Sequence, residues 1–150
     1  MALKPDRIEH LTDISFFMNT PAERGGVASF VTGGVGAAMD DADAVVAYEA
    51  LAAGSVPAGV LLNDVVDLDL TRQHINWHKD EVQVGGKVTL LRVGQVTTDK
   101  VDGDPSAGDT AYVGPSGTVS TTGGTGVSKI GTFLSGKDSD GYAKVSVNIQ

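Results

Sequence analysis

The residues best suited to hold a metal lie in the most polar inner stretch of this 150-residue chain. His74 and His78 are four residues apart, so on a helix both imidazoles would share one face and could bind zinc with a nearby carboxylate. A zincin motif needs Glu directly after its first His, whereas Ile75 stands there. We therefore interpret the stretch as a polar connector whose Trp77 is anchored in the core, and we expect no metal site.

Two groups of aspartates resemble fragments of calcium-binding loops. One group is Asp102, Asp104 and Asp109, and the other is Asp138 and Asp140, just before a glycine. Neither group has the twelve-residue loop and the closing Glu of a complete site. Aspartates are also common in turns, because the side chain hydrogen-bonds to its own backbone. We favour the turn interpretation for both groups.

The chain lacks the usual signs of nucleophilic or phosphate chemistry. It has no cysteine, which excludes disulfides, thiolate metal sites and a Cys nucleophile. Gly114–Thr118 is close to a nucleophile elbow, but its second glycine comes one residue early. Gly33–Gly36 and Gly123–Gly126 are not followed by the Lys-Ser or Lys-Thr of a phosphate-binding loop.

Asp67 and Asp69 are the paired carboxylates considered for acid and base catalysis. They alternate with apolar residues, which indicates a solvated strand face. We predict a protein that is not an enzyme and has no cofactor.

The charge of the chain limits its partners. The formal net charge is -8 at pH 7, so the mean field of the protein would repel a polyphosphate backbone. Charged residues interrupt the first ten positions, and no apolar run approaches 18 residues. We therefore expect no nucleic-acid partner, no membrane association and synthesis in a cytoplasm.

Composition favours an all-β fold with minor α content. Apolar residues make up 41% of the chain but aromatic residues only 5%, and 20 glycines and five prolines punctuate it. The alanine-rich segment Tyr48–Gly54 could be helical, and Ala44–Ala47 could be a strand or a helical turn. The predicted strands are Ala28–Thr32, Val60–Leu62, Val65–Leu70, Lys87–Thr98, Thr110–Val113, Thr118–Thr121, Val127–Leu134 and Tyr142–Ile149. Gly94 is expected to mark a bulge or bend in the longest of them.

The strand pattern divides the chain into three segments. Residues 81–150 contain five predicted strands joined by Gly-rich turns, which suggests a small C-terminal β-barrel or β-tulip-like hairpin domain. Residues 27–80 are interpreted as an irregular β-rich region that packs on this barrel. Residues 1–26 mix charges with apolar side chains and are interpreted as an extended N-terminal arm.

The apolar side chains of the arm would be costly to leave in water. We therefore expect them to cover either the chain's own barrel or a neighbouring subunit, and the sequence leaves both alternatives open. The residues expected at such an interface are Leu3, Ile8, Leu11, Ile14, Phe16, Phe17 and Met18.

The order of turns in the C-terminal segment resembles a known family. The runs GDTAYVGPSG at Gly108–Gly117, IGTFL at Ile130–Leu134 and DSDGYAKV at Asp138–Val145 are similar to the C-terminal barrel of head decoration (cement) proteins of tailed bacteriophages. Lys79–Glu81 and Gly86–Leu91 look like the same group. The likeness covers roughly residues 75 to 150 and consists of turn chemistry and strand patterning without a catalytic motif.

The resemblance implies a structural virion protein that binds the outer surface of a tailed-phage capsid and stabilises contacts between capsid subunits. It implies the major capsid protein as partner, commonly a homotrimer, and a place on the outer capsid surface after synthesis in the host bacterial cytoplasm. It provides no functional residue to carry over. The acidic charge would suit a protein that stays away from packaged DNA.

Two other functions are weighed against this one. Barrel-sandwich carrier domains also consist of short hairpins with an exposed Lys at a tight turn, and Lys137 stands in a predicted turn. Its neighbours, Gly136 and Asp138, differ from the Met or hydrophobic residues that flank a modified carrier Lys. A hydrolase or metalloenzyme would need a third ligand beside His74 and His78.

Overall fold

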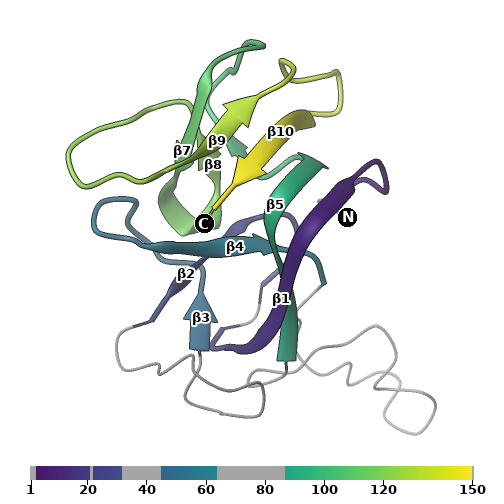
Figure 1. Ribbon diagram of the computed structural model, residues 1–150. Helices are drawn as coiled ribbons and strands as arrows, with labels where there is room; N and C mark the ends of the chain where they lie inside the picture. The colour runs from purple at the N-terminus through teal and green to yellow at the C-terminus, as the bar shows by residue number, and fades with distance from the viewer. Residues whose placement is uncertain (1–2, 21, 32–44, 64–86, 150) are drawn as a thin grey trace, which may run out of the picture.

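The computed structural model describes residues 3–20, 22–31, 45–63 and 87–149, and these residues form a single ten-stranded sheet (Figure 1). The all-β prediction is confirmed for them. The strands are β1 (Ile8–Met18), β2 (Val27–Phe30), β3 (Val45–Ala47), β4 (Pro57–Leu61), β5 (Lys87–Thr98), β6 (Val101–Asp102), β7 (Thr110–Val113), β8 (Val119–Ser120), β9 (Lys129–Phe133) and β10 (Ala143–Asn148).

Five of the strands close into a barrel. They follow the order β1-β3-β2-β4-β5, and an additional pairing between β1 and β5 completes the ring. The barrel is mixed because β1 and β3 run parallel, with Phe17 opposite Val45, whereas β1 and β5 run antiparallel. Its core contains the buried side chains of Phe16, Met18, Ala28, Val46, Ala58, Leu61, Val88 and Leu90.

The closed barrel differs in position from the one expected at residues 81–150. Only β5 of the ring comes from that segment, and the other four strands come from residues 8–61. The reason is β1, which the sequence suggested as an arm but which pairs with β5 from Ile8 to Phe17 and so supplies the pairing that closes the ring.

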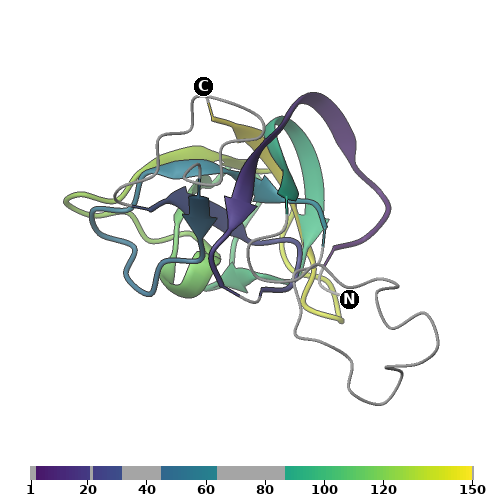
Figure 2. The same cartoon turned by 90° about the horizontal axis from the view of Figure 1, so that it is seen from below.

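The C-terminal strands extend the sheet from the other edge of β5. They follow the order β5-β10-β9-β7-β8-β6, and β6 begins only three residues after β5 ends, so the sheet curls back toward its starting strand (Figure 2). A second core of fifteen buried residues, which we call the C-terminal core, lies between this curl and the barrel strands β2 and β4, with Phe133, Ile130 and Leu3 among its largest side chains. The sheet therefore runs through all three segments expected from the sequence.

The strand predictions of the C-terminal segment agree closely with the structure. β5 and β7 have the predicted bounds, and β8, β9 and β10 lie within theirs. In β10 the predicted alternation is confirmed, because Ala143, Val145 and Val147 are buried while Lys144 and Ser146 are half-buried and Asn148 is exposed on the other face.

The expectation of minor helical content is wrong for the described residues. They contain no α-helix, and Tyr48–Gly54 is an irregular loop after β3. The single helical feature in the described ranges is a 3-10 turn, η2 (Pro115–Gly117), in the hairpin between β7 and β8. Alanine propensity is a weak prior, and here backbone groups of Glu49 and Gly54 form hydrogen bonds with other loops. The strand predicted at Val65–Leu70 lies outside the described residues.

Candidate interaction surfaces

The apolar residues expected at an interface divide into a buried and an exposed group. Leu3 lies in the C-terminal core, and Phe16 and Met18 lie in the barrel core, each at most 4% exposed. Phe17 is half-buried, with the Lys87 ammonium 5.5 Å from its ring centroid. Buried side chains cannot reach another protein, so Leu3, Phe16 and Met18 contribute to the chain's own cores, whereas Phe17 belongs to neither core.

The exposed group consists of Ile8, Leu11 and Ile14, which we call the β1 patch. Their side chains are 44%, 46% and 47% exposed. Ile8 and Leu11 lie in the part of β1, from Ile8 to Thr12, in which every residue is exposed, so both faces of the strand meet solvent there. Ile14 follows after the half-buried Asp13. Isolated exposed aliphatic side chains are common, but three on one strand indicate a contact surface.

β1 is paired along only one edge over most of its length. Its first ten residues pair with β5, whereas in the described part of the chain its other edge pairs only at Phe17 and Met18, with β3. The register with β5 shifts three times between Ile8 and Phe16. Such bulges twist an edge strand and discourage pairing of its backbone with strands of other chains. The exposed side chains of β1 can still contact another protein.

Gly94 fixes how closely β1 approaches β5. Its φ of 156° is unusual for any other residue, and a Cβ atom there would lie 2.1 Å from the carbonyl oxygen of Ile8. The expected bulge at this position is found in the facing strand instead, where His10 is the extra residue between Glu9 and Leu11. The glycine is therefore needed for close strand approach.

Ion pairs hold the N-terminal residues against the connection between β9 and β10. The Lys4 ammonium lies 3.1 Å from Asp138 Oδ2 and 4.5 Å from the Tyr142 ring centroid, and Lys144 lies 3.8 Å from Asp6. The pKa of Asp138 is lowered because the Tyr142 backbone N–H and then Lys4 donate to its carboxylate. The charged side chains of both pairs remain accessible to solvent, so the pairs orient the residues that precede β1 and contribute little to stability.

A second apolar surface, which we call the loop patch, consists of Phe30, Leu51 and Val56. These side chains are 40%, 74% and 57% exposed. Phe30 and the Glu49–Ser55 loop line a hollow of about 360 Å³, and the Phe30 N–H donates to the Val56 carbonyl over 2.9 Å. The Phe30 ring also packs edge-on against Phe16 at 5.4 Å, so the hollow lies directly outside the barrel core.

Hydrogen bonds fix the loop that carries this patch. Ser55 Oγ donates to the Leu51 carbonyl at 2.6 Å, and the Gly54 N–H donates to Gly126 at 2.9 Å. The Ser116 N–H donates to the Glu49 carbonyl at 2.8 Å. Leu51 is therefore presented from a loop that is tied to two other loops, which lowers the entropic cost of binding through it.

The sequence interpretation missed the loop patch, because it allowed a helix at Tyr48–Gly54 and placed a turn after it. A signal was present in the sequence. Leu51 and Val56 stand in a segment of small residues that has neither the period of a strand nor that of a helix to bury them.

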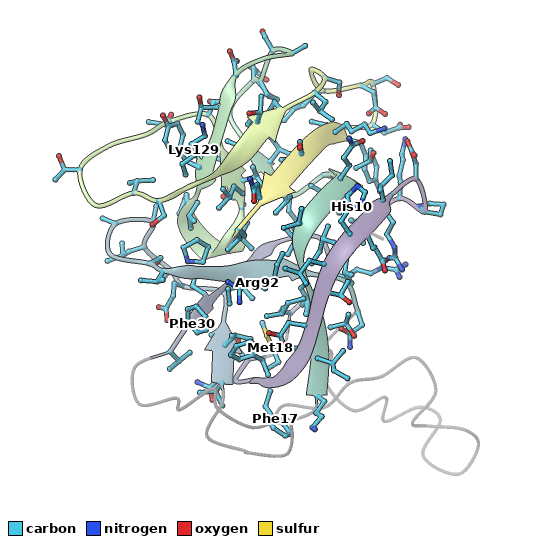
Figure 3. All side chains as sticks on the ribbon, in the orientation of Figure 1. His10, Phe17, Met18, Phe30, Arg92 and Lys129 are labelled. Atoms are coloured by element: carbon cyan, nitrogen blue, oxygen red, sulfur yellow. The ribbon has the colours of Figure 1, made fainter. Side chains whose placement is uncertain are left out.

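The two patches approach each other where the Phe30 ring packs against Phe16, which follows Ile14 of β1 by two residues. In Figure 3, Phe30 lies on the left and His10 of β1 on the right, and the loop before β4 extends to the left in Figures 1 and 2. Both patches belong to the five-stranded barrel, since β1 and β4 are two of its strands.

Asp109 and Asp138, one from each group considered for calcium, accept hydrogen bonds within turns, whereas Asp102 lies in β6 and accepts from Ser120 Oγ. Asp109 Oδ2 accepts the Ser106 N–H at 2.8 Å, and Asp138 Oδ1 accepts the N–H groups of Asp140 and Tyr142, both at 2.9 Å. Within the described ranges no three His, Asp or Glu side chains are placed to share a metal ion. This supports the turn interpretation for both groups.

The other residues considered for catalysis, modification or metal binding have a backbone role, are exposed, or lie outside the described residues. Ser116, in the sequence that is close to a nucleophile elbow, has a positive φ of 56° in the η2 turn and bonds through its backbone to Glu49. Lys137 is exposed in the connection between β9 and β10. His74, His78, Asp67, Asp69 and Gly33–Gly36 lie outside the described residues.

Comparison with known proteins gives no family for this chain. No protein-family model and no curated protein matches it. In the part of the chain that the structure describes, no helix has the length and apolar character needed to span a membrane.

Proposed function

We propose that this chain is a structural virion protein that binds the outer surface of a tailed-phage capsid and stabilises contacts between capsid subunits. The observation that carries the proposal is the presence of two exposed apolar patches, one on β1 and one around the loop before β4, on one five-stranded barrel. Such a body can contact two neighbours at once, which is the task of a protein that reinforces a shell.

The chemistry of the chain supports a structural role. Among the described residues, the aspartate groups are used in turns and the serine of the Gly-rich hairpin has a backbone role. A net charge of -8 disfavours contact with packaged DNA and suits the outer face of a capsid. The resemblance of the turns in residues 108–145 to cement proteins supports the same conclusion.

The proposal includes a finer description of the fold. We interpret the curled sheet β5-β10-β9-β7-β8-β6 as the β-tulip-like C-terminal unit that the resemblance implies. The five-stranded barrel beside it then carries both exposed patches. When several copies of the chain are linked together, one bound contact raises the effective concentration of the next. The overall affinity for the shell is then higher than that of a single weak contact.

The test uses expanded heads that lack the protein. Purified protein should co-sediment with these heads and raise the temperature at which they release DNA. Failure to co-sediment, or an unchanged release temperature at full occupancy, contradicts the proposal.

A matched pair of variants examines the role of the β1 patch. Leu11→Asp should lower occupancy on the heads at least tenfold, because it places a charge in a surface that must become dry. Leu134→Asp is the control, since Leu134 is 41% exposed, close to the 46% of Leu11, but belongs to neither patch. Equal binding of both variants would exclude the β1 patch from any role in attachment.

A further inference from the structure

We propose that a hollow on the outer face of β9 and β10 binds a sugar acid, that is, a small polyhydroxylated ligand with one carboxylate. The inference goes beyond the proposed function and is independent of it, because the hollow contains no residue of the β1 patch or the loop patch. Both patches therefore stay available while the ligand is bound.

The hollow has a volume of about 410 Å³ and lies over two antiparallel strands, with Ser146 of β10 opposite Thr132 of β9. The described residues that line it are Lys129, Gly131, Thr132, Ser146 and Asn148. The apolar residues of the two strands are buried on the other side of the sheet, in the C-terminal core: Ile130, Phe133, Ala143, Val145 and Val147. The described lining therefore has no apolar side chain, which suits a ligand rich in hydroxyl groups.

The backbone under the hollow is bare and already paired. A Cβ atom at Gly131 would lie 1.8 Å from the Ser146 carbonyl oxygen, so β9 and β10 approach too closely for a side chain at this position. β10 lies between β5 and β9, and β9 lies between β10 and β7. A peptide cannot add a strand here, because neither strand has an unpaired edge. The surrounding side chains must therefore bind the ligand.

The four polar side chains of the lining are available for this task. None of them forms a hydrogen bond or an ion pair with another residue in the part of the chain that the structure describes. The hydroxyls of Thr132 and Ser146 and the amide of Asn148 each donate and accept, so they can exchange hydrogen bonds with the hydroxyls of a sugar. Lys129, at the start of β9 (Figure 3), supplies three donors and a positive charge for a carboxylate.

The charge of this face distinguishes it from an ordinary polar sheet face. The strands β5, β7, β9 and β10 contain no Asp or Glu, whereas the whole chain has 19 acidic residues and a net charge of -8. These strands contain four cations, of which three have side-chain contacts within the chain: Lys87, Arg92 and Lys144. The fourth is Lys129, which lines the hollow. The acidic chain therefore presents a single positive charge here for an anion.

The same charges limit the ligand to one anionic group. The mean field of a protein with a net charge of -8 repels a polyphosphate, whereas a single carboxylate needs only the ammonium of Lys129 beside it. A largely apolar ligand needs apolar walls, which the described lining does not provide. A polyol with one carboxylate matches both the charge and the hydrogen-bonding groups of the hollow.

The first experiment is an NMR titration of the full chain with three probes. D-glucuronate has the hydroxyls and the carboxylate, D-glucose has the hydroxyls alone, and acetate has the carboxylate alone. D-glucuronate should shift the amide signals of residues 129–132 and 146–148 saturably, with a Kd of about 1 mM for a ligand of this size. D-glucose and acetate should each bind about fivefold more weakly or less, because each lacks half of the recognised groups.

The second experiment repeats the titration with matched variants. Lys129→Gln should weaken binding of D-glucuronate about fivefold and leave binding of D-glucose unchanged, because only the charge is lost. Ser146→Ala should weaken binding of both sugars, because both use the hydroxyl. Lys137→Gln is the control, since Lys137 is exposed in the connection between β9 and β10 but does not line the hollow. It should bind all three probes as the wild type does.

Three results would overturn the inference. The first is the absence of a saturable shift with D-glucuronate. The second is equal affinity for D-glucuronate and either of the other probes, which would mean a plain anion site or a neutral sugar site. The third is equal weakening by Lys129→Gln and Lys137→Gln, which would show a general effect of net charge. The titration requires no capsid, so its result is separate from that of the attachment experiment.

Discussion

Replacing Gly94 by alanine tests how β1 is seated on the barrel. The new Cβ atom would lie 2.1 Å from the Ile8 carbonyl oxygen, against about 3 Å for the closest real contacts, so β1 and β5 must separate by about 1 Å. Overpacking of this kind costs about 1–3 kcal/mol. The positive φ of 156° adds about 1–2 kcal/mol for a residue with a side chain.

The expected loss is therefore about 2–5 kcal/mol, which for a chain of this size lowers Tm by about 5–15 °C. Urea and thermal unfolding followed by circular dichroism measure it. Hydrogen exchange at the amides of β1 provides a second readout, since amides between Ile8 and Ile14 should exchange faster when the strand is displaced.

Two other glycines separate the causes. Gly108 has a φ of 97° with open space around its Cβ position, so Gly108→Ala reports the backbone cost alone. Gly131 has an ordinary φ but a Cβ position 1.8 Å from the Ser146 carbonyl oxygen, so Gly131→Ala reports the contact cost alone. If Gly94→Ala is no more destabilising than Gly108→Ala, the argument that Gly94 is required for close approach is refuted.

Three further predictions concern single side chains. Phe133→Ala empties the largest position of the C-terminal core and should cost about 3–5 kcal/mol in urea unfolding, whereas Leu134→Ala should stay within about 0.5 kcal/mol. Tyr48→Phe removes a hydroxyl that accepts the Gly26 N–H at 3.0 Å and donates to the Glu23 carbonyl, so unfolding experiments should show a loss of about 1–3 kcal/mol. The pKa of Asp138 is lowered in the folded chain, so its contribution is present above the ordinary value of 3.8 and is lost as pH falls through the folded value. An NMR titration should give a carboxyl pKa below 3.8, and Lys4→Ala should raise it; an unchanged value in that variant would show that Lys4 has no influence.

Sequence patterning predicted the C-terminal strands well because they depend on local signals. In β10, apolar and polar residues alternate strictly, and one face is buried, so the register was fixed by the hydrophobic effect alone. The hairpin from β7 to β8 could be predicted equally well, because its turn needs the Gly and Pro residues that the sequence contains.

Local patterns could not predict which N-terminal apolar residues are buried and which are exposed. Ile8, Leu11, Phe16 and Met18 are all apolar, and composition gives no reason why the first two are exposed and the others buried. The difference depends on pairing with β5, about 80 residues away, and on three register shifts that sequence spacing does not reveal. The same long-range pairing explains why the barrel closes from four strands of residues 8–61 together with β5.

The sequence by itself determined the all-β class, the strands β5 and β7 to β10, and the use of Asp109 and Asp138 in turns, because each of these depends on residues close together in the chain. It did not predict β6, which lies in a segment interpreted as a loop. The tertiary structure decided which strands close the barrel, which apolar residues remain exposed, and that the loop patch reaches β1 through the contact of Phe30 with Phe16. These features depend on contacts between distant segments. Their free energies are settled by packing and backbone pairing that no local pattern contains.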